Sequence, residues 1–351
     1  MRVKTMIAAV AALAWVGPAA AQPLVREAAG ATPAAIQAAV DAFRTDLGGV
    51  NNGNAAGSQS GGRREINWDG GGAAATPTLD PSPMTRFSNR GAVFTTPGHG
   101  FEISGAPSPN FGEINPVYGT HFAAFSSPRL FSALGSSVLD AWFFVPGSTT
   151  VAAGVPGFGA VFTGVSAASS TRLEFYAADG ALLYEHAVPP AAGNGTLSFV
   201  GVSFPYGEIV ARVRIVSGNT ALGPADAGAI DAVAMDDFVY GEPVAVQGLS
   251  ITPQTGRLFR TATLDLIVGV SGLTGTTVTG GRVQLDGYDV TAGFVACLIP
   301  GSQAAGQTFR CPVPRGAVAT GDHVLNVELN LSNGTRLRNA VRWTVIANTE
   351  P

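Results

Sequence analysis

The stretch IVARVRIVSGN (residues 209–219) decides the fold class of this chain. Its odd-numbered positions up to Ile215 are apolar, whereas Arg212 and Arg214 occupy even-numbered positions. Successive side chains of a β-strand point to opposite faces, so this spacing predicts a strand with an apolar face and a face that exposes arginines.

The same alternation recurs in TRLEFY (residues 171–176), where Arg172 and Glu174 occupy the polar positions. Short apolar runs, cut by glycine or proline, continue through this part of the chain. The predicted strands are 91–95, 101–104, 121–125, 138–145, 158–165, 171–176, 181–188, 197–204, 209–215 and 232–240. Strands that follow one another without helices between them predict an antiparallel, jelly-roll-like β-sandwich.

One helix precedes these strands. Thr32 is placed as its N-cap and Pro33 as its first residue, and Gly48-Gly49 ends it. Its apolar residues have helical spacing: Ile36, Val40, Phe43 and Leu47. Residues 50–90 are rich in Gly, Asn, Ser and Pro, and predict loops with one short strand around 65–68.

A second set of strands follows Glu242-Pro243. The predicted strands are 248–252, 264–270, 282–285, 290–295, 323–331 and 336–346. Their number and length are typical of an immunoglobulin-like β-sandwich. We therefore divide the chain into a signal peptide (1–21), an N-terminal helix with Gly/Pro-rich loops joined to the first domain (22–90), a jelly-roll-like β-sandwich (91–243) and an immunoglobulin-like domain (244–351).

The first 21 residues predict export. Arg2 and Lys4 precede an apolar run from residue 6 to residue 16, and small residues follow it before Gln22. The run is too short to span a membrane, so we expect cleavage and no membrane insertion afterwards. The protein is then periplasmic or extracellular, because both destinations use the same signal.

Composition excludes several classes of function. The chain of 351 residues is 46% hydrophobic and 13% charged, with a formal net charge of −4. Lys4 is its one lysine, so the exported chain has none for Schiff-base or P-loop chemistry. The acidic balance argues against a nucleic-acid partner.

Two cysteines, Cys297 and Cys311, lie fourteen positions apart. In an oxidising compartment such a pair predicts one disulfide. Zinc would need more ligands nearby, and the nearest histidine is His323.

Residues from about 90 to 243 resemble a known group of domains. The segments FGAVFTGV (158–165), LSFVGVSF (197–204) and AMDDFVYGEP (234–243) resemble the jelly-roll domains of uncharacterised secreted bacterial proteins, akin to galactose-binding-like and carbohydrate-binding modules. LDGYDVT (285–291) and the closing segment 321–345 similarly resemble bacterial immunoglobulin-like modules. Both resemblances imply a fold, and neither brings a catalytic motif with it.

No catalytic motif is present: G-x-S-x-G, H-E-x-x-H and G-x-G-x-x-G before a helix are all missing. A glycoside hydrolase could still pair carboxylates from separate strands. The available acids are Glu102, Glu113, Asp140, Glu174 and Glu208. Nothing in the sequence distinguishes two of them, so we expect no enzyme activity.

Asp236-Asp237 lies inside the last apolar strand of the first domain. Alternation directs one carboxylate inward or to an edge and the other to solvent, and a buried carboxylate needs a partner. In jelly rolls that this domain resembles, an acid at this place joins an N-terminal acidic group around a structural calcium ion. Asp69 or Glu65 would then be the partner. The alternative is that an aspartate caps loop amides or pairs with an arginine, for which the candidates are Arg63, Arg64 and Arg90.

Aromatic side chains in predicted loops are candidates for stacking on sugars. These are Trp68, Tyr118 and Tyr206, and loop packing is the alternative for each. Trp142 and Trp343 are expected in the cores. The sequence thus predicts an exported, non-catalytic protein that binds a glycan or cell-surface component through loops of the first sandwich. The alternatives are a structural or adhesive protein-interaction module and a carbohydrate-active enzyme.

Overall fold

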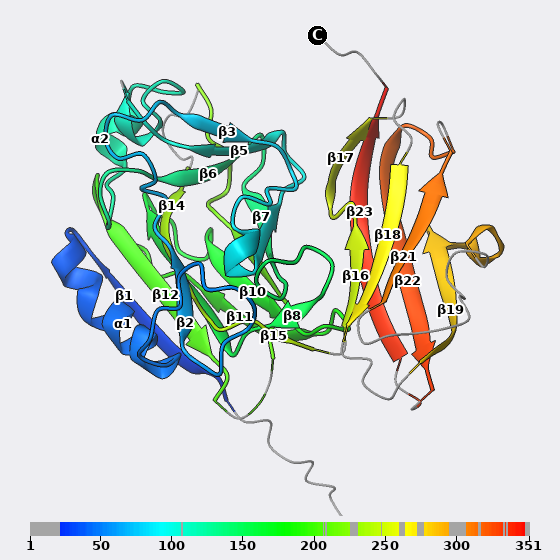
Figure 1. The fold of residues 1–351 in the computed structure, drawn as a ribbon. Coiled ribbons are helices and arrows are strands. Elements are labelled where there is room, and N and C mark those ends of the chain that lie inside the picture. The colour runs from blue at the N-terminus through cyan, green and yellow to red at the C-terminus, as the bar shows by residue number, and fades with distance from the viewer. Residues whose placement is uncertain are drawn as a thin grey trace, which may run out of the picture.

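The computed structural model describes residues 22–347 except 107, 206, 208, 225–230, 247, 260–263, 272–276, 295–306, 315–316, 333 and 335. Two β-sandwiches follow each other along the chain (Figure 1). Strands make up 47% of the structure and helices 9%, so the predicted all-β fold is confirmed. In these described ranges no helix is long and apolar enough to cross a membrane. The predicted signal peptide lies outside them.

The first sandwich consists of two antiparallel sheets. The larger sheet contains β1 (Leu24–Gly30), β2 (Arg63–Ile66), β3 (Thr78–Asp80), β5 (Gly100–Ile103), β6 (Phe131–Leu134), β9 (Gly157–Thr163), β12 (Leu197–Ser203) and β14 (Ala234–Gly241). Its order is β1-β12-β9-β14-β6-β5-β3, with β2 paired to β14. The smaller sheet contains β4 (Ala92–Thr95), β7 (Val138–Phe143), β10 (Arg172–Tyr176), β11 (Leu182–Ala187) and β13 (Arg212–Val216), in the order β11-β10-β13-β7-β4.

The alternation that predicted strand β13 is present in the structure. Val213 and Ile215 are fully buried in the core between the two sheets, together with Phe158 of β9. Arg212 and Arg214 lie on the opposite, outer face and are partly exposed. The smaller sheet therefore has an apolar inner face and a polar outer face.

Helix α1 (Pro33–Asp46) is the predicted helix, and it covers the outer face of the larger sheet (Figure 1). Thr32 is its N-cap, although the Thr32 side chain makes no capping hydrogen bond. Phe43 is fully buried against β9 and β12, where Gly159 and Gly201 pair with each other. The two glycines leave the space that the Phe43 ring fills.

The second sandwich has a three-stranded and a five-stranded sheet. Its strands are β16 (Gly248–Thr252), β17 (Gly256–Phe259), β18 (Leu264–Ser271), β19 (Val278–Leu285), β20 (Tyr288–Asp289), β21 (Gln307–Val313), β22 (Gly321–Leu331) and β23 (Arg336–Ile346). The sheet orders are β16-β18-β21 and β17-β23-β22-β19-β20. Trp343 belongs to the core between them, as expected, and donates its indole N–H to the carbonyl oxygen of Pro253 at 3.1 Å. Cys311 of β21 is buried and is not a free thiol. Cys297 lies outside the described residues, so the disulfide stays a prediction.

The two sandwiches touch at several points. β8 (Ala153–Gly154) of the first part pairs with β15 (Val244–Ala245), which leads into β16. Ser250 Oγ lies 3.2 Å from the carbonyl oxygen of Thr150, and a Cβ on Gly269 would come within 2.4 Å of the same oxygen. These close backbone approaches hold the second sandwich against one end of the first.

Some predicted elements differ from the structure. Residues 121–125 were expected to form a strand, but α2 (Tyr118–His121) and an irregular segment occupy this place. Asn115 Oδ1 accepts the Val117 N–H at 3.1 Å just before this helix, which favours a turn over an extended chain. The expected strand 290–295 is a 3₁₀ turn, η3 (Thr291–Gly293), as far as the structure describes it. Two further 3₁₀ turns are η1 (Ser88–Arg90) and η2 (Pro109–Phe111).

The packing of Phe43 generates a first prediction. A Cβ on Gly201 would lie 2.5 Å from the Phe43 ring, so Gly201→Val must displace the ring or the helix. We expect a loss of about 2 kcal/mol or more in the free energy of unfolding, measured by urea denaturation. Gly49→Val is the control, because nothing lies within 4 Å of its Cβ position. Equal stability of the two variants would contradict this packing.

Candidate functional site

The structure places two of the three predicted sugar-stacking residues in the core. Trp68 is 3% exposed and stacks on Phe131 with ring centroids 3.8 Å apart. Tyr118 is 2% exposed, and its hydroxyl bonds to the backbone of Gly223. The expectation that these two offer exposed ring faces is therefore wrong, because both loops fold back over apolar surface. Tyr206 lies outside the described residues.

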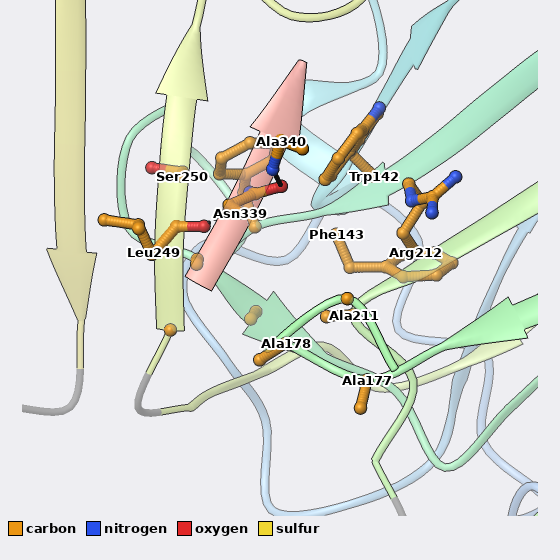
Figure 2. Close-up of a pocket in the computed structure, with 15 residues that line it drawn as sticks. Trp142, Phe143, Ala177, Ala178, Ala211, Arg212, Leu249, Ser250, Asn339 and Ala340 are labelled. Atoms are coloured by element: carbon orange, nitrogen blue, oxygen red, sulfur yellow. Dashed lines mark hydrogen bonds between the residues drawn. The ribbon is translucent and has the colours of Figure 1, made fainter. Parts of the chain in front are cut away.

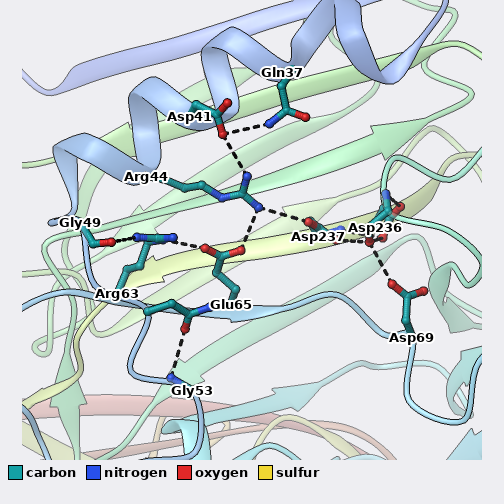
Figure 3. Close-up of polar contacts among 12 residues, drawn as sticks. Gln37, Asp41, Arg44, Gly49, Gly53, Arg63, Glu65, Asp69, Asp236 and Asp237 are labelled. Carbon is teal, nitrogen blue, oxygen red and sulfur yellow. Dashed lines mark hydrogen bonds and ion pairs between the residues drawn. The ribbon is translucent and has the colours of Figure 1, made fainter.

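The three predicted metal ligands, Asp69, Asp236 and Asp237, do lie close together (Figure 3), and all three contact Ser126. The Ser126 hydroxyl lies 2.5 Å from Asp237 Oδ1, 3.2 Å from Asp69 Oδ2 and 3.4 Å from Asp236 Oδ1. Asp236 Oδ2 also accepts the backbone N–H groups of Phe125 and Ser126, at 2.7 and 3.0 Å. The alternative of an aspartate that caps loop amides is thus what the structure contains at Asp236.

A β-bulge explains why both aspartates approach the same serine. The register between β14 and β9 shifts between Asp236 and Phe238, so Asp237 is an extra residue in its strand. Strict alternation would have directed one of the two carboxylates to solvent, but Asp236 is 0% and Asp237 only 4% exposed. Its partner is also not among the expected arginines, since Arg44 of α1 reaches it, with Nη2 3.6 Å from Asp237 Oδ2 (Figure 3).

As placed, these carboxylates do not fit a calcium ion. Calcium takes six to eight oxygen ligands, whereas the oxygens of Asp236 already accept N–H groups from residues 125, 126 and 237. Within the described ranges, no three Asp, Glu, His or Cys residues are arranged to hold a metal. Burial raises the pKa of Asp236, Asp237 and Asp69, and the two neighbouring charges raise the pKa of Asp236 further. The cluster fastens the 125–126 loop to β14.

Two members of the predicted acid pool form another carboxyl pair. Glu102 of β5 is 5% exposed, and its Oε1 has no hydrogen-bond partner in the described part of the protein. Burial, together with a hydrogen bond and repulsion from Glu113, raises the pKa of Glu102 to about 8. The pair therefore holds a proton at neutral pH.

The outer face of the smaller sheet carries a site that the sequence analysis missed. Trp142 of β7 lies on this face and not in the core, and its indole N–H donates to Thr95 Oγ1 at 3.1 Å. The guanidinium of Arg212 lies between two rings, 3.7 Å from the Tyr176 centroid and 5.2 Å from that of Trp142. The alternation within residues 138–143 indicates this placement, because it puts Trp142 on the same face of the strand as Asp140.

Ion pairs fix the arginines on this face. Asp140, 1% exposed, accepts from Arg212 Nη1 at 2.7 Å and from Arg214 Nε and Nη2 at 2.9 Å each. Burial alone would raise the pKa of Asp140, but the two guanidinium groups outweigh it and lower the pKa. On the next strand, Glu174 accepts from Arg172 Nε at 2.9 Å and from the Tyr176 hydroxyl at 2.5 Å. Each guanidinium on this face thus has a carboxylate partner.

Trp142 and Arg212 line a cavity of about 120 Å³ between the two sandwiches (Figure 2). Leu249, Ser250, Asn339 and Ala340 of the second sandwich form its other side. A second cavity, of about 350 Å³, lies against the polar outer face of the five-stranded sheet. Its polar lining comes from Asp179, Arg282, Gln284, Asn326, Glu328, Arg338 and Asn339. Both cavities share Gly180, Asn339 and Ala340, and we call them together the inter-sandwich groove.

Comparisons with known proteins find similarity to solved structures at low sequence identity. No family model matches the chain, and no curated protein does. Fibronectin(III)-like modules of CbhA from Clostridium thermocellum are 11% identical, over 62% of this chain and 91% of theirs, with a TM-score of 0.20. Dimeric latent PorU from Porphyromonas gingivalis is 15% identical, over 61% of this chain and 22% of PorU, with a TM-score of 0.22. The ZmpB structure from Clostridium perfringens, an M60 catalytic domain with CBM51-1 and CBM51-2, is 8% identical, over 78% of this chain and 28% of that chain, with a TM-score of 0.16. Likenesses this low carry no argument about function.

The pair of Glu102 and Glu113 generates a prediction about pH. The raised pKa means that the folded state favours protonated Glu102, so the associated stability is present below about pH 4.5 and is lost as pH rises through about 8. At about pH 9 we expect the free energy of unfolding of Glu102→Gln, measured by urea denaturation, to exceed that of the native chain by about 2 kcal/mol. The difference should be smaller at about pH 5. Glu185→Gln, on an exposed side chain, should change neither. A native-like pH profile for Glu102→Gln would exclude the protonated pair.

The ion pairs of Asp140 predict that its replacement destabilises the protein, in contrast to the replacement of Glu102. Asp140→Asn removes a buried negative charge that compensates Arg212 and Arg214, so we expect a loss of about 3 kcal/mol or more in the free energy of unfolding near neutral pH. The loss should shrink at low pH, where native Asp140 itself becomes protonated. Asp179→Asn, in the exposed turn between β10 and β11, is the matched control. Urea denaturation of the three proteins checks both statements.

Proposed function

We propose that this chain is an exported, non-catalytic binding protein that holds a hydroxyl-rich ligand, a glycan, in the inter-sandwich groove. The observation that carries the proposal is the layered arrangement of Tyr176, Arg212 and Trp142 on the outer face of the smaller sheet. The binding surface is then this sheet face, and not the loop aromatics Trp68 and Tyr118.

The chemistry of the groove favours a sugar over an apolar ligand. Sugar rings pack their C–H faces on aromatic side chains and bond their hydroxyls to fixed polar groups. Trp142 supplies the aromatic surface, while Arg212 and Asn339 supply polar groups beside it. Asn339 is held in place, since its Nδ2 donates to the carbonyl oxygen of Leu249 at 2.6 Å.

The same geometry supports binding without hydrolysis. Glycoside hydrolysis uses an acid with a raised pKa and a second carboxylate on opposite sides of the scissile bond. Asp140 has a lowered pKa and both its oxygens accept from arginines, so it has no proton to donate near neutral pH. Glu174 is likewise engaged by Arg172 and Tyr176.

Replacement of Trp142 tests the proposal. The native protein should be retarded in native gels that contain one of a panel of soluble polysaccharides, and Trp142→Ala should weaken this binding about tenfold or more. Trp142→Phe keeps an aromatic ring and should retain part of the affinity, whereas Tyr288→Ala, on a 77% exposed ring outside the groove, should retain all of it.

Circular dichroism and thermal unfolding confirm that each variant is folded before its binding is compared. Unchanged binding by folded Trp142→Ala would refute this site. Failure of the folded native protein to bind any polysaccharide would favour the protein-interaction alternative, for which capture of a protein partner is the readout.

A further inference from the structure

We infer that the second sandwich forms half of the binding site and that the ligand is an extended, uncharged polysaccharide chain lying across both sandwiches. This inference rests on the proposed function. It concerns what the groove selects, and it gives the second sandwich a role in recognition beyond that of a spacer.

The length of the ligand follows from the connection between the two cavities. The first lies beside Trp142 and Arg212, and the second lies over β19, β22 and β23. Gly180, Asn339 and Ala340 line both, so the cavities meet where the β10–β11 turn approaches β23. A single sugar would fill one cavity at most, whereas a chain that enters at Trp142 continues past Ala340 into the second.

The second cavity offers hydrogen-bonding groups from several polar side chains. The side chain of Asn326 points into it and, among the residues that the structure describes, has no hydrogen-bond partner. Gln284 and Arg338 lie beside it on the neighbouring strands β19 and β23. Amide and guanidinium groups on a sheet face suit the hydroxyls that a chain presents along its length.

The charge of the ligand follows from the ion pairs in the groove. Arg338 Nε donates to Glu328 Oε2 at 2.7 Å, and Arg282 Nε donates to Asp289 Oδ2 at 3.1 Å. On the first sandwich, three carboxylates compensate three guanidinium groups: Asp140, Glu174 and Glu185 pair with Arg172, Arg212 and Arg214. Positive and negative groups thus already compensate one another, so a uronate or sulfate chain would have to displace internal partners.

The relative position of the two sandwiches is held by contacts within the protein, at the edge of the groove and beyond it. Thr150 touches Ser250 and the backbone of Gly269, and Gly256 lies against Ser82 and Thr96. The groove is therefore formed before a ligand arrives, which lowers the entropic cost of binding a flexible chain.

The experiment compares chain lengths by isothermal titration calorimetry. The probes are the di- and hexasaccharides of the neutral polysaccharide that the native protein binds, and the full chain is used throughout. We expect the hexasaccharide to bind at least about tenfold more tightly than the disaccharide. Its affinity should be unchanged between about 0.05 and 0.5 M NaCl, since no ion pair to the ligand is screened.

Variants of the second sandwich identify where the chain runs. Asn326→Ala and Ala340→Gln should each lower the affinity for the hexasaccharide several-fold. The first removes a hydrogen-bonding group, and the second adds a bulky side chain at an exposed alanine where the two cavities meet. Asn326→Ala should weaken binding of the disaccharide less than binding of the hexasaccharide. Ala187→Gln is the matched control, because Ala187 is also an exposed strand alanine but lies outside the groove.

The outcomes separate this inference from the proposed function. Equal affinity for both lengths, with binding still lost in Trp142→Ala, would overturn the inference and keep the glycan site. If uronate chains bind more tightly than neutral chains and this affinity falls as the salt concentration rises, the inference that the ligand is uncharged would be overturned. If no polysaccharide binds the native protein at all, the proposed function fails first.

Discussion

Asp140 lies almost entirely out of solvent on a sheet face, and two guanidinium groups compensate its charge. A buried carboxylate without partners would destabilise the fold by several kcal/mol, so this pairing restrains Arg212 and Arg214 to one geometry. In that geometry Arg212 lies between the rings of Tyr176 and Trp142. The Trp142 ring is thereby kept at the edge of the groove, and the proposed binding surface depends on Asp140, which the ligand need not touch.

The other acidic clusters of the first sandwich have a different electrostatic character. Asp140 is surrounded by arginines and its pKa is lowered, whereas burial raises the pKa values of Asp236, Asp237 and Glu102. The carboxyl groups of the second kind therefore take up a proton more readily than exposed acids do. Burial is common to all of them, so the sign of each pKa shift depends on whether neighbouring cations outweigh burial, as Arg212 and Arg214 do at Asp140.

The contact between the two sandwiches turns a sheet face into a groove. An isolated outer face with Trp142 and Arg212 would be a flat, partly exposed patch. The approach of Asn339 and Ala340 from the second sandwich adds a wall with polar groups. Glycines at positions 256 and 269 permit this approach, because a side chain on either would meet atoms of the first sandwich within 3.5 Å.

The sequence by itself determined the fold class, the long helix and the division of residues between sheet faces, because these depend on spacing along the chain. Alternation placed Arg212 and Arg214 on an outer face, and helical spacing placed Phe43 against the sheet. The same alternation, applied to residues 138–143, would have placed Trp142 outside, but its aromatic character favoured the core. Only the tertiary structure decided that Trp68 and Tyr118 are buried, that a bulge brings Asp236 and Asp237 to one serine, and that Trp142 faces Asn339 across a groove. Those contacts join residues far apart in the chain, and no local pattern encodes which distant loop or strand will cover a given side chain.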